Sequence, residues 1–140
     1  MSETLFTSTA TAKGGREGHV QSSDNVVSFD TAMPGTPRAK KLENSTNPEQ
    51  LFAAGYAACF DGALQLVAGK EKVKFESEVT ANVSLQKDEA DQGFKLAVKL
   101  QVKGTGIEKD QLQDLVEKAH QVCPYSKATR DNIEVTLEAL

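Results

Sequence analysis

Two cysteines, Cys59 and Cys123, are the residues of this 140-residue chain best suited to covalent chemistry. They are too few for a disulfide-built scaffold, and a reducing cytosol would keep a structural bridge open. A free cysteine is either a small buried apolar residue or, as its thiolate, a nucleophile and redox centre. The surroundings of each cysteine must decide between these interpretations.

Cys59 lies in the middle of a helix that the sequence predicts over residues 47–68. Asn47 can cap this helix, Pro48 suits its first turn, and Gly69 offers a stop. The Ala- and Gly-rich neighbours of Cys59 leave space beside the sulfur for a substrate. Four aromatic residues could line an apolar approach to it, although core packing is the simpler interpretation of each: Phe52, Tyr56, Phe60 and Tyr125.

Cys123 is predicted at the junction of two helices. Apolar residues at helical spacing predict a helix over residues 108–122. Pro124 follows Cys123 directly, and proline is tolerated only at the start of a helix. A short helix is therefore expected over residues 124–130.

The remaining pattern predicts an α+β fold, with one domain over residues 1–140. Strands are expected over residues 4–13, 19–21 and 26–29, followed by a loop over residues 33–46. After the long central helix, alternating apolar residues predict an antiparallel hairpin of strands 73–85 and 94–102 with one buried face. The second helix and a closing strand over residues 133–137 complete the order.

Composition argues against two classes of partner. The net charge is −4 and the lysines are scattered, whereas nucleic acid binding depends on a concentrated basic surface. No run of about 18 apolar residues predicts a membrane span, and no signal peptide is recognisable at the start. We therefore expect a cytoplasmic protein that binds neither nucleic acid nor membrane.

Three stretches together resemble the organic hydroperoxide resistance family of the osmotically inducible protein C superfamily: NPEQLFAAGYAACFDGAL, VCPYSKATRDNIEV and AKGGREGHV. The resemblance extends over essentially the whole chain. It implies a thiol-dependent peroxidase, in which Cys59 attacks the peroxide and Cys123 resolves the product. It also implies that Arg16 is the catalytic arginine and that Glu49 is the acid paired with it.

The resemblance further implies the partners of this reaction. The substrate would be an organic hydroperoxide, and no cofactor would be bound. An external dithiol, with a lipoyl-bearing protein favoured over glutathione, would reopen the disulfide after each turnover. The family also favours a homodimer, with the chains intertwined.

The residue types fit this chemistry. A free cysteine has a pKa near ~8.5, so a neighbouring charge must favour its reactive thiolate. The guanidinium of Arg16 is always charged and offers a fixed fork of donors, which Glu49 could hold by a bidentate contact. Attack on the O–O bond would leave a sulfenic acid on Cys59, and a nearby thiol converts such an acid into a disulfide.

One geometric constraint bears on the number of chains. On a straight helix, Glu49 and Cys59 are separated by a rise of ~15 Å and a rotation of roughly 280°. Such side chains cannot share one small site. Either the helix breaks between them, or the Glu49 that serves a given Cys59 comes from a second subunit of a homodimer.

Three alternatives stay open. A metal site would have to use His19, Cys59, His120 and Cys123, which lack the usual ligand spacing of zinc sites. A non-catalytic redox sensor, or a carrier of apolar molecules, would use the cysteine pair only as a switch. A peroxidase of the sibling branch would share the chemistry but differ in preferring hydrogen peroxide or a broader range of substrates.

Overall fold

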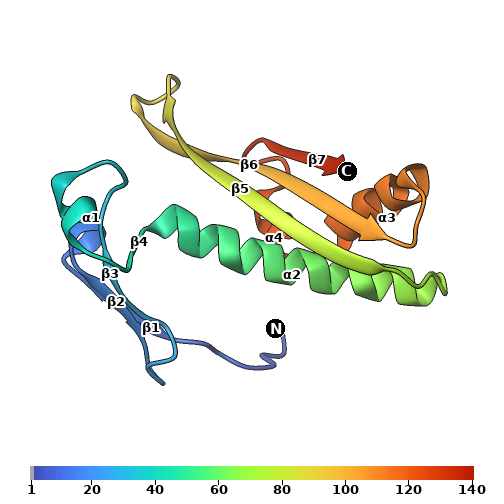
Figure 1. The fold of residues 1–140 in the computed structure, drawn as a ribbon, viewed down its shortest axis with the longest axis horizontal. Coiled ribbons are helices and arrows are strands. Elements are labelled where there is room, and N and C mark those ends of the chain that lie inside the picture. The colour runs from blue at the N-terminus through green and yellow to red at the C-terminus, as the bar shows by residue number, and fades with distance from the viewer. Residues whose placement is uncertain (1) are drawn as a thin grey trace. The chain divides into compact units, whose positions relative to one another are not determined.

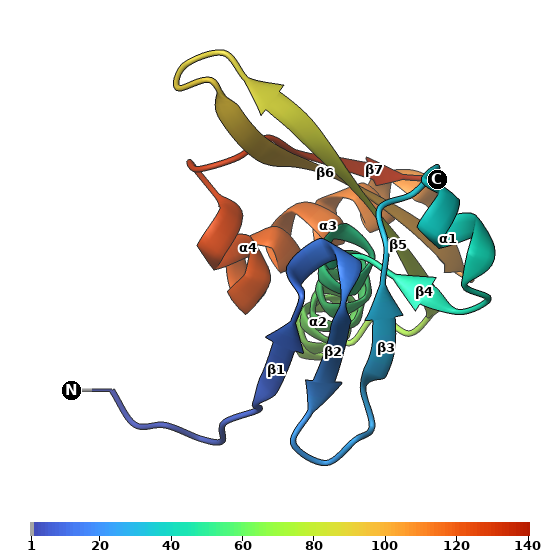
Figure 2. The same cartoon turned by 90° about the vertical axis from the view of Figure 1, so that its left-hand side faces the viewer.

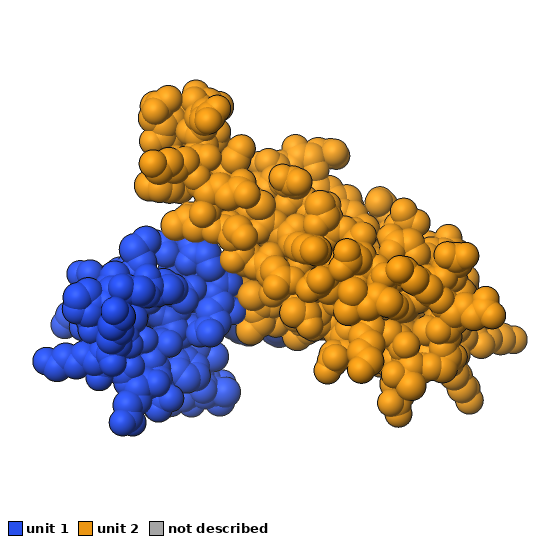
Figure 3. Space-filling model, turned by 45° about the horizontal axis from the view of Figure 1, so that its top comes forward, with its two compact units in different colours: residues 1–51 blue, residues 52–140 orange. Residues whose placement is uncertain are grey.

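The computed structural model describes residues 2–140. The chain divides into two compact units, residues 1–51 and residues 52–140, which are coloured separately in Figure 3. Helix α2 (Pro48–Lys70) begins in the first unit and continues into the second. The prediction of one domain over residues 1–140 stays a prediction.

The first unit is a small sheet whose strands lie in the order β1-β2-β3-β4 (Figure 1). These strands are β1 (Ala10–Lys13), β2 (His19–Ser22), β3 (Ser28–Thr31) and β4 (Ser45–Thr46). The first three pair antiparallel, and β4 pairs parallel to β3. A 3-10 turn, η1 (Gly15–Glu17), connects β1 to β2, and a short helix, α1 (Pro37–Lys41), precedes β4.

Helix α2 begins as the sequence predicts and ends slightly later. The side chain of Asn47 accepts a hydrogen bond from the backbone N–H of Gln50 at 2.8 Å, which caps the first turn. Gly69 does not stop the helix. Instead, Lys72 takes the left-handed conformation with φ 58°, and the N–H of Val73 bonds to the carbonyl of Ala68 at 2.9 Å. This is the Schellman arrangement, in which a residue beyond the last turn reverses the chain.

The second unit packs helices on one face of the sheet β5-β6-β7 (Figures 1 and 2). The long hairpin of β5 (Glu76–Asp88) and β6 (Gly93–Thr105) is antiparallel, and β7 (Val135–Ala139) pairs parallel to β6. Helices α2, α3 (Lys109–Val122) and α4 (Pro124–Thr129) complete the unit. The inward side chains Val98, Leu100 and Val102 of β6 share one core with Leu64 of α2 and Leu115 of α3.

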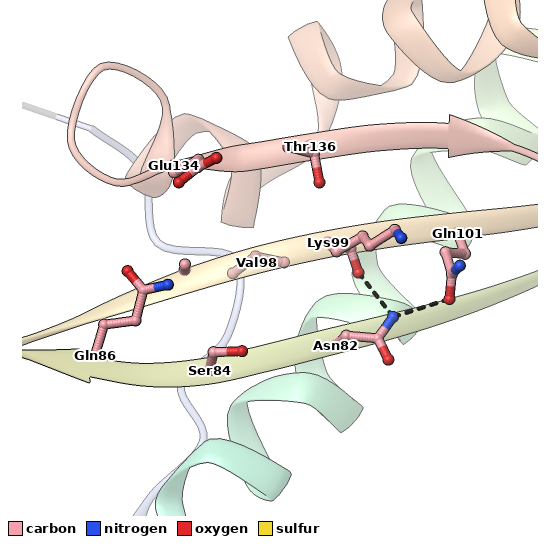
Figure 4. Close-up of a pocket in the computed structure, with 9 residues that line it drawn as sticks. Asn82, Ser84, Gln86, Val98, Lys99, Gln101, Glu134 and Thr136 are labelled. Carbon is pink, nitrogen blue, oxygen red and sulfur yellow. Dashed lines mark hydrogen bonds between the residues drawn. The ribbon is translucent and has the colours of Figure 1, made fainter.

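The opposite face of this sheet is polar. A groove runs over the three strands there (Figure 4), and its polar lining residues are Asn82, Ser84, Gln86, Lys99, Gln101, Glu134 and Thr136. The amide of Asn82 donates to the carbonyl of Lys99 at 3.2 Å and to the side-chain oxygen of Gln101 at 3.1 Å. These contacts hold the polar side chains to each other across the strands, and the groove contains neither cysteine.

The predicted α+β class and the order of the main elements are confirmed, with three local corrections. Residues 4–9 form no strand, and only Ala10–Lys13 pair with β2. The segment predicted as a loop over residues 33–46 contains α1 and β4. Thr36 caps α1 by accepting from the N–H of Ala39 at 3.3 Å, and Pro37 occupies its first position. The first hairpin strand begins at Glu76 and not at residue 73, and both strands extend further toward the turn than alternation of apolar residues indicates, because polar residues continue the pairing to Asp88 and Gly93.

Helix α2 is long and apolar enough to cross a membrane by length and composition alone. Central helices of globular proteins share these properties. In this chain the apolar side chains Tyr56, Phe60 and Leu64 of α2 are fully buried in the core of the second unit. Packing in the core therefore accounts for the apolar character of the buried face of the helix.

Candidate active site

The two cysteines, 64 positions apart in the sequence, lie in contact in the second unit. The thiol of Cys123 donates toward the sulfur of Cys59 with an Sγ–Sγ distance of 3.5 Å. Both cysteines are free; Cys123 is fully buried and Cys59 is half-buried. A disulfide has an S–S length of about 2.05 Å, so a modest approach of the two sulfurs would allow the bond to form.

Cys123 occupies the junction that the sequence predicts. Its backbone is extended, with φ −61° and ψ 125°, so it belongs to neither helix. Its N–H bonds to the carbonyl of Ala119 in α3, and its carbonyl accepts from the N–H of Lys127 in α4, both at 2.9 Å. One residue thus ends α3 and begins α4, and its position is fixed by both helices.

A buried network of hydroxyl groups ties α4 to α2 and α3. The side-chain oxygen of Ser126 lies 2.8 Å from the hydroxyl of Tyr56 and 2.8 Å from Nδ1 of His120. Thr129 bonds to the same Tyr56 hydroxyl at 3.0 Å. Tyr56 and Ser126 are completely buried, so breaking one of these bonds would leave a polar group without water to replace the partner.

His120 is part of this support for Cys123. Burial, and secondarily the nearby Arg130, lower the pKa of the His120 imidazole below 6.5, which favours its neutral form. Arg130 also donates to the backbone carbonyl of His120 at 2.6 Å. The last turn of α3 is therefore held by hydrogen bonds to both its side chain and its backbone.

The environment of Cys59 opposes ionisation of its thiol. Burial is the largest cause and raises the pKa of Cys59 above its ordinary value, while a hydrogen bond from the backbone N–H of Tyr125 acts in the opposite direction. Within residues 52–140, the thiol form is thus favoured. A thiolate at this position requires a positive charge, as the sequence predicts, and a role for Arg16 in supplying it stays a prediction.

Arg16 and Glu49 form a bidentate ion pair in the first unit. Nη1 of Arg16 donates to Oε2 of Glu49 at 2.9 Å, and Nη2 donates to Oε1 at 2.7 Å. The Arg16 side chain is 42% exposed, whereas that of Glu49 is only 14% exposed. The hydrogen bonds from Arg16 lower the pKa of Glu49 below 4.5, so the carboxylate stays charged and orients the guanidinium.

The sequence GGREG builds the turn that carries Arg16. Gly14 has φ 83°, a conformation that favours glycine, and a side chain at Gly18 would collide with the carbonyl of Lys13. Between them, the N–H of Glu17 bonds to the carbonyl of Gly14 at 3.1 Å and closes the turn. The glycines are thus required for Arg16 to project from this tight connection.

Two residues that sequence reasoning missed support the same turn. The hydroxyl of Thr31 donates to the carbonyl of Gly15 at 2.7 Å and accepts from the N–H of Gly18 at 2.8 Å. Arg38 of α1 donates to the carbonyls of Thr31 and Gly18 at 3.0 and 3.2 Å. A Thr-Pro pair at residues 36–37 signals the helix that carries Arg38, but no local pattern reveals the role of Thr31, which depends on strand pairing.

The structure therefore brings the four predicted site residues together as two pairs. Cys59 contacts Cys123 in the second unit, and Arg16 contacts Glu49 in the first. Of the four aromatic candidates, Tyr56 and Phe60 are buried core residues, as the simpler interpretation has it. Phe52 is half-buried, and Tyr125 is 38% exposed.

The histidines considered for a metal site have hydrogen-bonding partners. His19 lies 3.0 Å from both Asp30 and Ser28, and His120 bonds to Ser126. Over residues 2–140, no three ligating side chains cluster in a way that could hold a metal ion.

Comparison with known proteins places this geometry in a family. Residues 40–138 match the family described as OsmC-like protein. The chain is 72% identical over 138 residues to the organic hydroperoxide resistance protein OhrA of Bacillus subtilis (strain 168), covering 99% of this chain and 98% of that protein. It is 50% identical to the organic hydroperoxide resistance protein of Xanthomonas axonopodis pv. citri (strain 306), covering 95% of this chain and 93% of that protein.

The fold agrees with the sequence comparison. The crystal structure of the organic hydroperoxide resistance protein OhrB of Bacillus subtilis superposes with a TM-score of 0.92 at 50% identity, covering 98% of this chain and 100% of that chain. The chain therefore belongs to the OsmC-like family and, within it, to the organic hydroperoxide resistance proteins.

The support of the Arg16 turn can be tested with a Thr31→Val substitution. This change keeps the shape of the side chain but leaves the Gly15 carbonyl and the Gly18 N–H without their partner. We expect a loss of about 1–3 kcal/mol in the free energy of unfolding, measured by urea denaturation. Thr11→Val, at an exposed position of the same sheet, is the control and should change it by less than about 0.5 kcal/mol. Equal effects of the two changes would contradict a supporting role for Thr31.

The ion pair can be tested by titration. Because Arg16 lowers the pKa of Glu49, the ion pair contributes fully to stability above pH 4.5. This contribution is lost as the pH falls through the lowered pKa of Glu49. Carboxyl NMR should therefore give Glu49 a midpoint below 4.5, and an Arg16→Gln variant should return the midpoint toward 4.5. An unchanged midpoint in that variant would show that the contact does not form in solution.

Proposed function

We propose that this protein is a thiol-dependent peroxidase that reduces organic hydroperoxides to alcohols. The names of its relatives, organic hydroperoxide resistance proteins, support a role in peroxide detoxification and the oxidative stress response. The observation that carries the proposal is the contact of Cys59 and Cys123 at 3.5 Å. Two thiols at this distance can pass from a dithiol to a disulfide within one chain.

The proposed cycle has two chemical steps. The Cys59 thiolate attacks the O–O bond of the hydroperoxide; the alcohol leaves after taking up a proton, and Cys59 becomes a sulfenic acid. The thiol of Cys123 then attacks the sulfenic sulfur, and a disulfide forms with loss of water. Cys59 is the attacking residue because it is half-buried, whereas Cys123 is fully buried.

Arg16 supplies the positive charge for this reaction in our proposal. Its guanidinium, oriented by Glu49, would stabilise the Cys59 thiolate and the alkoxide that departs. Helix α2 has no break between Pro48 and Lys70, so the first of the two geometric alternatives does not apply. We therefore favour an intertwined homodimer in which Glu49 and Arg16 of one chain serve Cys59 of the other.

An external dithiol would complete the cycle by reducing the disulfide. Exchange proceeds by attack of a thiolate on an accessible sulfur, and the half-buried Cys59 offers that sulfur. A lipoyl-bearing protein is the proposed donor, because its reduced dihydrolipoyl group is a dithiol that can open the bridge without a second reductant molecule and is itself oxidised to the cyclic disulfide. The reaction would take place in the cytoplasm, and no cofactor would remain bound.

Consumption of cumene hydroperoxide in the presence of excess dihydrolipoamide tests this function. The protein should turn over continuously, Cys59→Ser should consume none, and Cys123→Ser should consume about one equivalent before Cys59 is over-oxidised. A single equivalent consumed by the unchanged protein would instead indicate a redox sensor. A clearly higher second-order rate with hydrogen peroxide than with cumene hydroperoxide would favour the sibling branch.

Sharing between chains can be tested by complementation. A chain with Glu49→Gln mixed with a chain carrying Cys59→Ser should recover about a quarter of the original rate, since half of the dimers are mixed and each has one intact site. Glu49→Gln mixed with a chain carrying both changes is the control and should remain inactive. No recovery in the first mixture would show that each site is built from one chain.

A further inference from the structure

The ring of Tyr125 packs directly against Gly55 of α2. A Cβ atom at residue 55 would lie 2.6 Å from the phenol oxygen of Tyr125 and 3.1 and 3.2 Å from two of its ring carbons. The other glycines of α2, Gly62 and Gly69, have no such neighbour within 4 Å. The lack of a side chain at residue 55 is thus what allows the ring to lie directly on the helix.

Aromatic neighbours hold the Tyr125 ring against Gly55. The ring centroid of Tyr125 lies 6.0 Å from that of Phe52 at an interplanar angle of 63°, and 5.6 Å from that of Tyr56 at 46°. Both neighbours belong to α2, and Tyr56 is anchored by Ser126 and Thr129. Since aromatic pairs at such separations attract each other, the ring is held to the helix on more than one side.

The contact of Tyr125 with Gly55 lies close in sequence to the sulfurs of Cys59 and Cys123. Gly55 precedes Cys59 by four residues, which places both on one face of α2. Tyr125 follows Cys123 by two residues, and its backbone amide acts to lower the pKa of the Cys59 thiol, against the effect of burial. The ring of Tyr125 therefore attaches the start of α4 to α2 where the sulfurs lie 3.5 Å apart.

We propose that Tyr125, packed on Gly55, is a positioning residue that fixes the distance between the sulfurs of Cys123 and Cys59. A substitution that lifts the ring from α2 also moves the start of α4, and with it the sulfur of Cys123. Disulfide formation depends on this approach, because a displacement of about 1 Å can cost a well-oriented reaction about 100-fold. The spacing of the sulfurs is independent of any substrate, whereas its consequence for peroxide resistance rests on the proposed function.

Under that function, the packing of Tyr125 on Gly55 determines which of two reactions consumes the sulfenic acid on Cys59. In one reaction the thiol of Cys123 displaces the hydroxyl group, so that a disulfide and water form. In the other, a second hydroperoxide oxidises the sulfenic acid to a sulfinic acid and is itself reduced to the alcohol. Only the first reaction depends on the position of Cys123. Weakening the contact of Tyr125 with Gly55 should therefore increase over-oxidation of Cys59.

The disulfide equilibrium in dithiothreitol redox buffers tests the positioning without peroxide. Gly55→Ala should lower the equilibrium constant for forming the Cys59–Cys123 bridge by about tenfold or more. Gly62→Ala, on the same helix with open space, should leave it unchanged. Thermal melts of the reduced proteins separate this effect from stability, since an equal destabilisation of both redox forms does not move the equilibrium.

A double-mutant cycle assigns the effect to the ring. Tyr125→Ala should also lower the constant, Tyr125→Phe should retain it, and adding Gly55→Ala to Tyr125→Ala should have no further effect. Equal constants for Gly55→Ala and Gly62→Ala, or additive effects in the cycle, would overturn the proposal. If Gly55→Ala does not fold, the contrast between Tyr125→Ala and Tyr125→Phe decides by itself.

Over-oxidation by cumene hydroperoxide provides the second measurement. The fraction of Cys59 found as sulfinic acid by mass spectrometry should rise severalfold in Gly55→Ala and remain at the original level in Gly62→Ala. A shifted dithiothreitol equilibrium without any peroxide consumption would support the positioning and reject the proposed function. Peroxide turnover with an unshifted equilibrium would support the function and reject the positioning.

Discussion

The contact between the two sulfurs depends on one backbone position, the extended residue between α3 and α4. Cys123 ends one helix and begins the next, so its backbone cannot move without moving both. The hydroxyl network of Tyr56, Ser126 and Thr129 fixes α4 to α2 from within the core. The Cys123 thiol is fully buried and faces the sulfur of Cys59.

This placement has an electrostatic cost that the chemistry must offset. The burial that orders the cysteine pair also raises the pKa of Cys59, which disfavours the thiolate that the proposed function needs for attack on a peroxide. The Arg16–Glu49 pair offers the complementary property, a permanently charged fork on a turn built by glycines and held by Thr31 and Arg38. In the account proposed here, the two halves meet in a homodimer, and the arginine makes the ordered cysteine reactive.

Much of this was predictable from sequence because the signals are local. Asn47 and Pro48 mark the start of α2, Pro124 marks the helix junction, and alternation marks the hairpin. The cysteine contact itself was predictable only through family resemblance, since no periodicity relates residues 59 and 123. Sequence reasoning missed the interactions that depend on tertiary contacts, including the hydrogen bonds of Thr31 and the packing of Tyr125 on Gly55. In the segment predicted as a loop, the capping signal of Thr36 and Pro37 was outweighed by the density of turn-forming residues.

Peptide mapping after one equivalent of cumene hydroperoxide tests the central claim most directly. Trypsin releases Cys59 within residues 42–70 and Cys123 within residues 119–127. The account predicts that these two peptides are recovered joined by a disulfide, and that they separate on treatment with dihydrolipoamide. Recovery of Cys59 as sulfinic acid, with the Cys123 peptide unmodified, would contradict it.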